Sequence, residues 1–135
     1  MKYKVVTDEL LINKTCVYAI LPFEKLDETG SAVFKIGRTE NIGRRIENYH
    51  TDFVLGCYLV CFLDFVDNSI TKFRLIKIED FIFHRIKELG AKNIQSTTRP
   101  KGNEWYYTNI NTLHKVFKEA QTIYGGVTFI PFEAH

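Results

Sequence analysis

The chain has 135 residues, of which 45% are hydrophobic and 25% are charged, and its formal net charge at pH 7 is +2. These values are typical of a globular domain with a single hydrophobic core, and they exclude a disordered chain. The net charge is too small to indicate nucleic-acid binding by itself, so any basic binding surface must be local. We therefore expect one domain that spans residues 1–135.

The first half of the chain predicts a hairpin, a short helix and a third strand. Residues 15–22 and 32–37 are rich in Val, Ile, Tyr and Phe, as expected for two paired strands. Thr39 can cap a helix from about 40 to 50. The run at 54–65 is apolar nearly throughout, which predicts a strand with a central place in the sheet.

The second half alternates helical and extended patterns. The expected elements are a helix from 70 to 89, a polar loop from 91 to 103, a strand from 104 to 108, a helix from 111 to 124 and an apolar edge segment from 127 to 135. Gly90 stands at the C-cap of the first helix, and Pro131 limits the pairing of the last segment. This alternation predicts an α+β fold, with a small, mostly antiparallel sheet flanked by helices.

The cysteine pattern and the absence of targeting signals indicate a reducing compartment. Three cysteines, Cys16, Cys57 and Cys61, cannot form an even set of disulfides. Cys57 and Cys61 are expected on one face of their apolar run, as small core residues and not as metal ligands. The sequence shows no signal peptide and no apolar stretch of about 18 residues or more. We expect an intracellular protein, in the cytoplasm or nucleus, with no membrane partner.

Four side chains from the hairpin and the helix after it should gather beside the sheet: Tyr18, Lys35, Arg38 and Arg45. One tyrosine and three cations are what a phosphodiester site requires, so the segment points toward nucleic-acid chemistry. His50 flanks the same helix and is a further candidate for a phosphate contact, although a surface or capping role is the alternative.

Helical spacing indicates which charged residues turn toward the sheet. In the helix at 70–89, an apolar stripe consists of Leu75, Ile78, Ile82, Ile86 and Leu89. At about 100° per residue, Glu79 lies roughly 55° from the centre of this stripe and Asp80 roughly 155° away. A carboxylate held against a sheet needs an arginine, hydrogen-bond donors or a metal ion. Glu79 as a member of a structural ion pair is the alternative.

The helix at 40–50 shows the same arrangement. Its apolar face consists of Ile42, Ile46 and Tyr49. Arg45 lies about 65° from the centre of this face, whereas Arg44 points nearly opposite. An arginine whose stem covers the core edge while its head stays in water is the alternative for Arg45. We expect Tyr18, Lys35, Arg45 and Glu79 to cluster on one face of the sheet.

Taken in order, these residues form a family pattern. Cys16-Val17-Tyr18 and Lys35-Ile36-Gly37 are two tripeptides on adjacent strands, followed by Arg45, Glu79 and the segment Asn103-Glu104-Trp105-Tyr106. The set resembles the GIY-YIG nuclease superfamily over a core of about residues 15–109. In particular it resembles a branch common in phages and large DNA viruses, which tends to carry KIG as its second tripeptide.

The resemblance implies a DNA endonuclease that uses one divalent ion, Mg²⁺ or Mn²⁺ in its place, bound by Glu79. Arg45 would neutralise charge on the phosphoryl oxygens and Tyr18 would orient the attacking water. Lys35 replaces the second motif tyrosine. It would serve as a general base if burial lowered its pKa, or as a phosphate clamp if it stayed protonated.

Other residues are expected to contact DNA: Arg38, His50, Arg99, Lys101 and Asn103. Trp105, Tyr106 and Tyr107 could stack on bases, although strand alternation places at least one of them in the core. No second DNA-binding domain is visible, so specificity would come from loops, a homodimer or a partner protein. Two alternatives remain open: a nucleic-acid-binding module that has lost cleavage, and a small structural domain whose charged residues form ion pairs.

Overall fold

The computed structural model describes residues 14–22, 26–42, 57–65, 71–94 and 104–131. In chain order its elements are β1 (Cys16–Pro22), β2 (Ser31–Thr39), β3 (Cys57–Phe65), α2 (Lys72–Glu88), β4 (Lys92–Asn93), β5 (Trp105–Asn109), α3 (Ile110–Tyr124) and β6 (Val127–Pro131). The strands form one sheet in the order β4-β5-β2-β1-β3-β6, and every neighbouring pair is antiparallel. The expected α+β class is confirmed.

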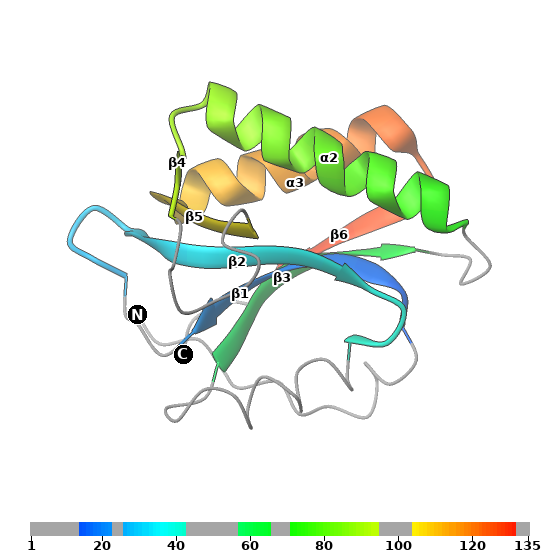
Figure 1. Cartoon of the computed structure of the whole chain (residues 1–135), viewed down its shortest axis with the longest axis horizontal. Helices are drawn as coiled ribbons and strands as arrows, with labels where there is room; N and C mark the ends of the chain where they lie inside the picture. Colours follow the sequence, from blue (N-terminus) through cyan, green and yellow to red (C-terminus); the bar gives the residue numbers. More distant parts are fainter. Residues whose placement is uncertain (1–13, 23–25, 43–56, 66–70, 95–103, 132–135) are drawn as a thin grey trace.

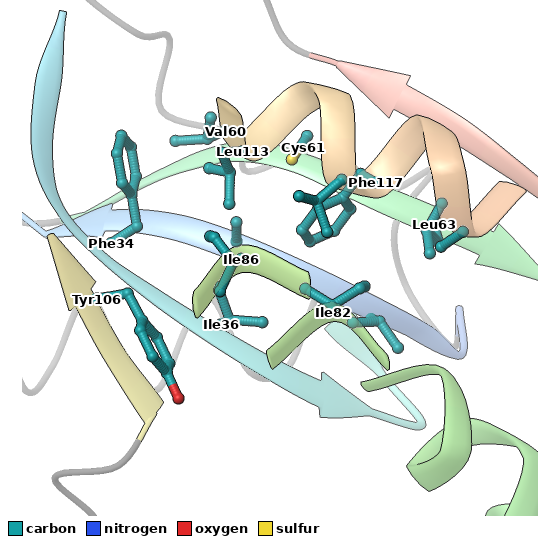
Figure 2. Packing of buried hydrophobic residues seen from close by; sticks show 14 of the residues in the cluster. Phe34, Ile36, Val60, Cys61, Leu63, Ile82, Ile86, Tyr106, Leu113 and Phe117 are labelled. Atoms are coloured by element: carbon teal, nitrogen blue, oxygen red, sulfur yellow. The ribbon is translucent and has the colours of Figure 1, made fainter. Parts of the chain in front are cut away.

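Helices α2 and α3 lie together on one face of the sheet (Figure 1). Their apolar sides meet even-numbered residues of β2, such as Phe34 and Ile36, in a closely packed core (Figure 2). The stripe predicted for α2 is confirmed, because Ile78, Ile82 and Ile86 are fully buried there. Each buried side chain of this size contributes about 1.5–3 kcal/mol of transfer free energy, so this interface holds the helices in place.

Local capping explains where the two helices begin and end. The Thr71 hydroxyl accepts a hydrogen bond from the Arg74 N–H, and the Asn109 side chain accepts one from the Asn111 N–H. Gly90 follows α2 with φ +96°, a left-handed conformation that favours glycine. The predicted helix boundaries are therefore correct to within about two residues.

Strand alternation divides the sheet residues into two clusters. The first cluster lies under the helices and includes Val17 and Ala19 of β1. The second cluster lies on the opposite face and consists of Cys16, Tyr18, Ile20, Ile42, Leu59, Phe62 and Trp105. Successive strand residues point to opposite faces, so position along a strand decides which environment a side chain enters.

A β-bulge in β3 lies between the two cysteines that were expected to share one face, Cys57 and Cys61. Ala19 pairs with Cys61, but Ile20 pairs with Leu59, which leaves Val60 as an extra residue. As a result Leu59 packs in the second cluster and Cys61 in the first. The spacing between Cys57 and Cys61 crosses this bulge, so simple alternation no longer implies a shared face. Cys61 is a buried core residue, as expected, whereas the side chain of Cys57 lies outside the described residues.

The remaining strand predictions have mixed outcomes. β3 lies inside the sheet between β1 and β6, and β6 is the expected edge strand. Residues 91–103 were expected to form a loop, but Lys92–Asn93 form β4, which pairs with β5. Two polar residues give no strand pattern, so only the pairing partner reveals β4. The helix expected at 40–50 lies outside the described residues beyond Ile42.

Candidate functional site

Four of the predicted site residues lie in the described part of the chain, on β1, β2 and α2: Tyr18, Lys35, Arg38 and Glu79. The others lie outside the described residues, and their roles stay predictions: Arg45, His50, Arg99, Lys101 and Asn103. The site is therefore built from the two motif strands and from α2.

Glu79 is held against the helix-covered face of the sheet by an arginine. The Arg38 Nη1 donates a hydrogen bond to the Glu79 Oε1 over 2.9 Å, and only 6% of the Glu79 side chain is exposed. The second oxygen, Oε2, is buried and has no hydrogen-bond partner within the described part of the chain. Asp80, the next residue, is exposed, as helical spacing predicted. A buried carboxylate with one unsatisfied oxygen is costly, and such a group calls for an explanation.

The surroundings of Glu79 make it a less acidic carboxyl than usual. Burial raises its pKa above the ordinary glutamate value, and the positive charge and hydrogen bond of Arg38 oppose this rise. The negative charges of Glu104 and Asp80 raise the pKa further. A nearby cation would therefore stabilise the ionised form of Glu79.

Tyr18 lies on the other face, directly against the glycine of the second tripeptide. Tyr18 and Gly37 are cross-strand partners. A Cβ added to Gly37 would lie 2.6 Å from the Tyr18 hydroxyl oxygen and 2.8 Å from Cζ. Only a glycine leaves room for this ring, and Tyr18 is only 2% exposed. The motif tyrosine and the motif glycine thus form one packing unit.

Lys35 projects from the same face as Tyr18 and lies beside Trp105, the first residue of β5, and Glu104, which precedes that strand. Its Nζ lies 3.5 Å from the Glu104 Oε2 and 5.7 Å from the centre of the Trp105 ring. The Lys35 and Glu104 side chains are 18% and 22% exposed. A carboxylate and the face of an indole both attract the positive charge of a lysine side chain.

The expected clustering on one face of the sheet is wrong for the three residues of that set that can be compared, Tyr18, Lys35 and Glu79, because Arg45 lies outside the described residues. Tyr18 and Lys35 point away from the helices, whereas Glu79 descends from α2 onto the opposite face. The physical reason is strand alternation: within β2, Ile36 points toward the helices, and its neighbour Lys35 cannot. The β2 residue that meets Glu79 is Arg38, three positions later.

The two faces approach each other at the edge of β2. In the described part of the chain, β5 pairs with β2 only as far as Lys35, opposite Trp105. Glu104 stands just before Trp105, and its charge influences Glu79 across this edge. Two cations and two carboxylates therefore form a charge cluster, which we define as Lys35, Arg38, Glu79 and Glu104. Glu104 was not predicted as a site residue, although the resemblance to a Glu-Trp-aromatic strand includes it.

The aromatic residues of β5 offer little surface for base stacking. Trp105 and Tyr106 are 5% and 1% exposed and belong to the two core clusters. Tyr107 is 38% exposed, but its hydroxyl donates a hydrogen bond to the Asp27 carboxylate. The expectation that alternation buries at least one of these rings is confirmed.

A single hydrated metal ion fits the donors better than a metal cage does. Among the described residues, no three His, Cys, Asp or Glu side chains gather as they would around a fully protein-bound ion. Mg²⁺ commonly takes one or two carboxylates and keeps several waters. The unpartnered Oε2 of Glu79 supplies one such ligand, so the residues present fit this ion.

These features define an α+β domain with an antiparallel sheet, helices on one face and a charge cluster at the edge of its second strand. Residues 15–121 match the T5orf172 domain, and the chain belongs to this family, which is related to the GIY-YIG nucleases. No curated protein and no solved structure matches the chain. Within the described ranges, no helix is both long and apolar enough to span a membrane.

Proposed function

We propose that this domain is a Mg²⁺-dependent endonuclease that hydrolyses DNA phosphodiester bonds. The observation that carries the proposal is Glu79, a buried carboxylate with one oxygen bound by Arg38 and the other without a described partner. A structural ion pair explains the first oxygen but leaves the second unexplained. The family match adds support, because nuclease-like or DNA-binding activity is expected of a T5orf172 domain.

In this proposal, each described residue of the cluster has a defined task. Glu79 would hold Mg²⁺, or Mn²⁺ in its place, through Oε2; when bound, the ion supplies positive charge for the leaving oxygen. Arg38 keeps Glu79 ionised and, with 34% of its side chain exposed, presents further N–H groups to a phosphate. Lys35 offers a second cation at the same strand edge. Arg45 is proposed to neutralise charge on the phosphoryl oxygens.

Tyr18 has a more limited role than the resemblance implied. Its ring is buried against Gly37, on the face opposite to Glu79. We propose that its main role is to fix the spacing of β1 and β2, and that contact of its hydroxyl with water or phosphate contributes less to the function.

A nucleic-acid-binding module without cleavage is the second candidate. It is favoured by two observations: Glu79 already has a cationic partner in Arg38, and Lys35 stands where the superfamily has a tyrosine. In this case the cluster would bind phosphate without hydrolysing it.

Cleavage assays with plasmid and branched DNA, with and without Mg²⁺ or Mn²⁺, separate the two candidates. For the nuclease, Glu79→Gln should lower the cleavage rate at least about a hundredfold, because the charge that stabilises the transition state is lost. DNA binding in EDTA should persist in the same variant. Asp80→Asn is the matched control, since this neighbouring carboxylate is exposed, and it should cleave at nearly the parent rate. Mg²⁺-dependent cleavage that is equal in Glu79→Gln and the parent would reject the metal assignment.

A further inference from the structure

Glu104 belongs to the Glu-Trp segment of the motif pattern, but no site role has been assigned to it, and it forms an ion pair with Lys35. Its carboxylate lies 3.5 Å from the Lys35 Nζ, and both side chains are about four-fifths buried. The Trp105 ring lies beside the same ammonium group, with its centre 5.7 Å from Nζ. Glu104 thus occupies a position beside Lys35 where an incoming anion would bind.

Arg38 is also paired with a carboxylate, on the face of the sheet that the helices cover. Its guanidinium is bound by the Glu79 carboxylate, and 34% of its side chain is exposed. Both cations of β2 that face the site therefore have internal carboxylate partners. The charge cluster is formally neutral, with two positive and two negative groups. Arg38 can present N–H groups that Glu79 does not occupy, whereas a phosphodiester that binds the Lys35 ammonium group must compete with Glu104.

We infer that Glu104 is a positioning residue: it holds Lys35 as a cation at the strand edge and is displaced from it by a phosphodiester oxygen. This inference rests on the proposed function for its substrate class. It assigns Lys35 the phosphate-clamp role, because the Glu104 carboxylate lies 3.5 Å from the Lys35 Nζ, where a phosphate oxygen would also bind. Glu104, and not Glu79, is the carboxylate that is exchanged, since the Glu104 pair is longer and Glu104 is the more exposed.

The exchange predicts an unusual effect for a conservative substitution. Glu104→Gln keeps the shape of the side chain but removes the competing charge, so DNA should bind more tightly. A partly exposed ion pair contributes about 0.2–1 kcal/mol, which corresponds to roughly 1.5- to 5-fold in the dissociation constant. Glu104→Asp retains the carboxylate and should bind like the parent protein. Lys35→Met should weaken binding and lower the salt slope by about one unit on duplex DNA.

The experiment measures fluorescence anisotropy of a labelled DNA duplex at several salt concentrations in EDTA, so that cleavage does not interfere. The proteins are the parent, Glu104→Gln, Glu104→Asp, Lys35→Met and the Lys35→Met, Glu104→Gln double variant, with melting temperatures as a folding check. Glu119→Gln is the charge-matched control, because Glu119 also binds an arginine, Arg85 at 2.8 Å, but lies on α3 in the helix layer. We expect tighter binding from Glu104→Gln only when Lys35 is present, and no change from Glu119→Gln.

Several results would overturn the exchange. Equal tightening by Glu104→Gln with and without Lys35 would indicate a general charge effect. No tightening by Glu104→Gln, or no DNA binding by the parent protein, would refute the exchange. Cleavage of plasmid DNA by a parent protein that fails these binding tests would refute the exchange and leave the nuclease proposal standing. Tightening that depends on Lys35, in a protein that never cleaves, would support the exchange and refute hydrolysis.

Discussion

Gly37→Ala tests whether the second motif glycine is required because of the ring beside it. The added Cβ would lie 2.6 Å from the Tyr18 hydroxyl oxygen and 2.8 Å from Cζ, whereas ordinary contacts between carbon atoms are about 3.5–4.0 Å. The ring must therefore move by about 1 Å, or β1 and β2 must separate. Because Tyr18 is 2% exposed and its strand pairs on both sides, neither movement is easy.

The expected cost follows from overpacking of a buried site. Such substitutions typically destabilise by about 1–3 kcal/mol. With an unfolding entropy near 2.1 cal/mol/K per residue, a domain of this length should lose roughly 4–10 °C in melting temperature. Without the clash, the same change should be mildly stabilising by about 0.5–1 kcal/mol, because glycine in a strand costs more conformational entropy than alanine.

A double-mutant cycle with Tyr18→Leu separates these two effects. Leucine lacks both of the ring atoms that the new Cβ would meet, so Gly37→Ala in this background should be neutral or stabilising. Thermal melts followed by circular dichroism give the four stabilities. An equal effect of Gly37→Ala in both backgrounds would refute the packing explanation and would point to a backbone requirement at Gly37.

Three further predictions concern charges. The proposed cleavage requires ionised Glu79, whose pKa is raised by burial, so activity should be lost on acidification at a higher pH than for an ordinary glutamate. Arg38→Met removes a positive charge that lowers this pKa, so it should move the loss of activity to a still higher pH in a pH–rate profile. The raised pKa also means that the folded state holds a proton more tightly than the unfolded state. The stability that Glu79 contributes should therefore fall as the pH rises above the ordinary glutamate pKa of about 4.3. In Glu79→Gln, the melting temperature should depend less on pH in that range. Arg74→Ala should lower the melting temperature by about 3–4 °C, because two hydrogen bonds from its guanidinium to the carbonyls of Tyr124 and Gly125 are lost; an unchanged melting temperature would show that water replaces them.

Much of the fold was predictable because its signals are local. Val, Ile and Phe runs marked the strands, a 3-4-4-3 apolar stripe marked α2, and Asn109 and Gly90 stand at helix ends where their side chains or backbone conformation are favoured. The burial of Glu79 and the exposure of Asp80 followed from helical geometry alone. These features depend on residues close in sequence.

What could not be predicted depends on pairing between distant segments. β4 forms because Lys92 and Asn93 pair with residues of β5. The bulge at Val60 forms because β3 has one residue more than β1 between the pairs Ala19–Cys61 and Ile20–Leu59. The partner of Glu79 is Arg38, 41 residues away, and neither residue type nor spacing selects it over other cations. The number of residues between two charges says nothing about their distance once a sheet intervenes.

Strand alternation in β2 explains why the charge cluster has residues on both faces of the sheet. Lys35 and Arg38 are separated by three positions in one strand, and an odd separation places side chains on opposite faces. Strand β2 therefore supplies one cation to each face of the sheet. Both cations can contact one phosphodiester only at an edge where no neighbouring strand separates them. In the described part of the chain, β2 has that edge beyond Lys35, where its pairing with β5 ends. Because Lys35 already has a carboxylate partner there, a phosphate that binds Lys35 must replace an existing ion pair and not simply add a new one. Affinity for nucleic acid should then be modest and sensitive to salt, and it should increase when Glu104 is neutralised while cleavage still depends on Glu79.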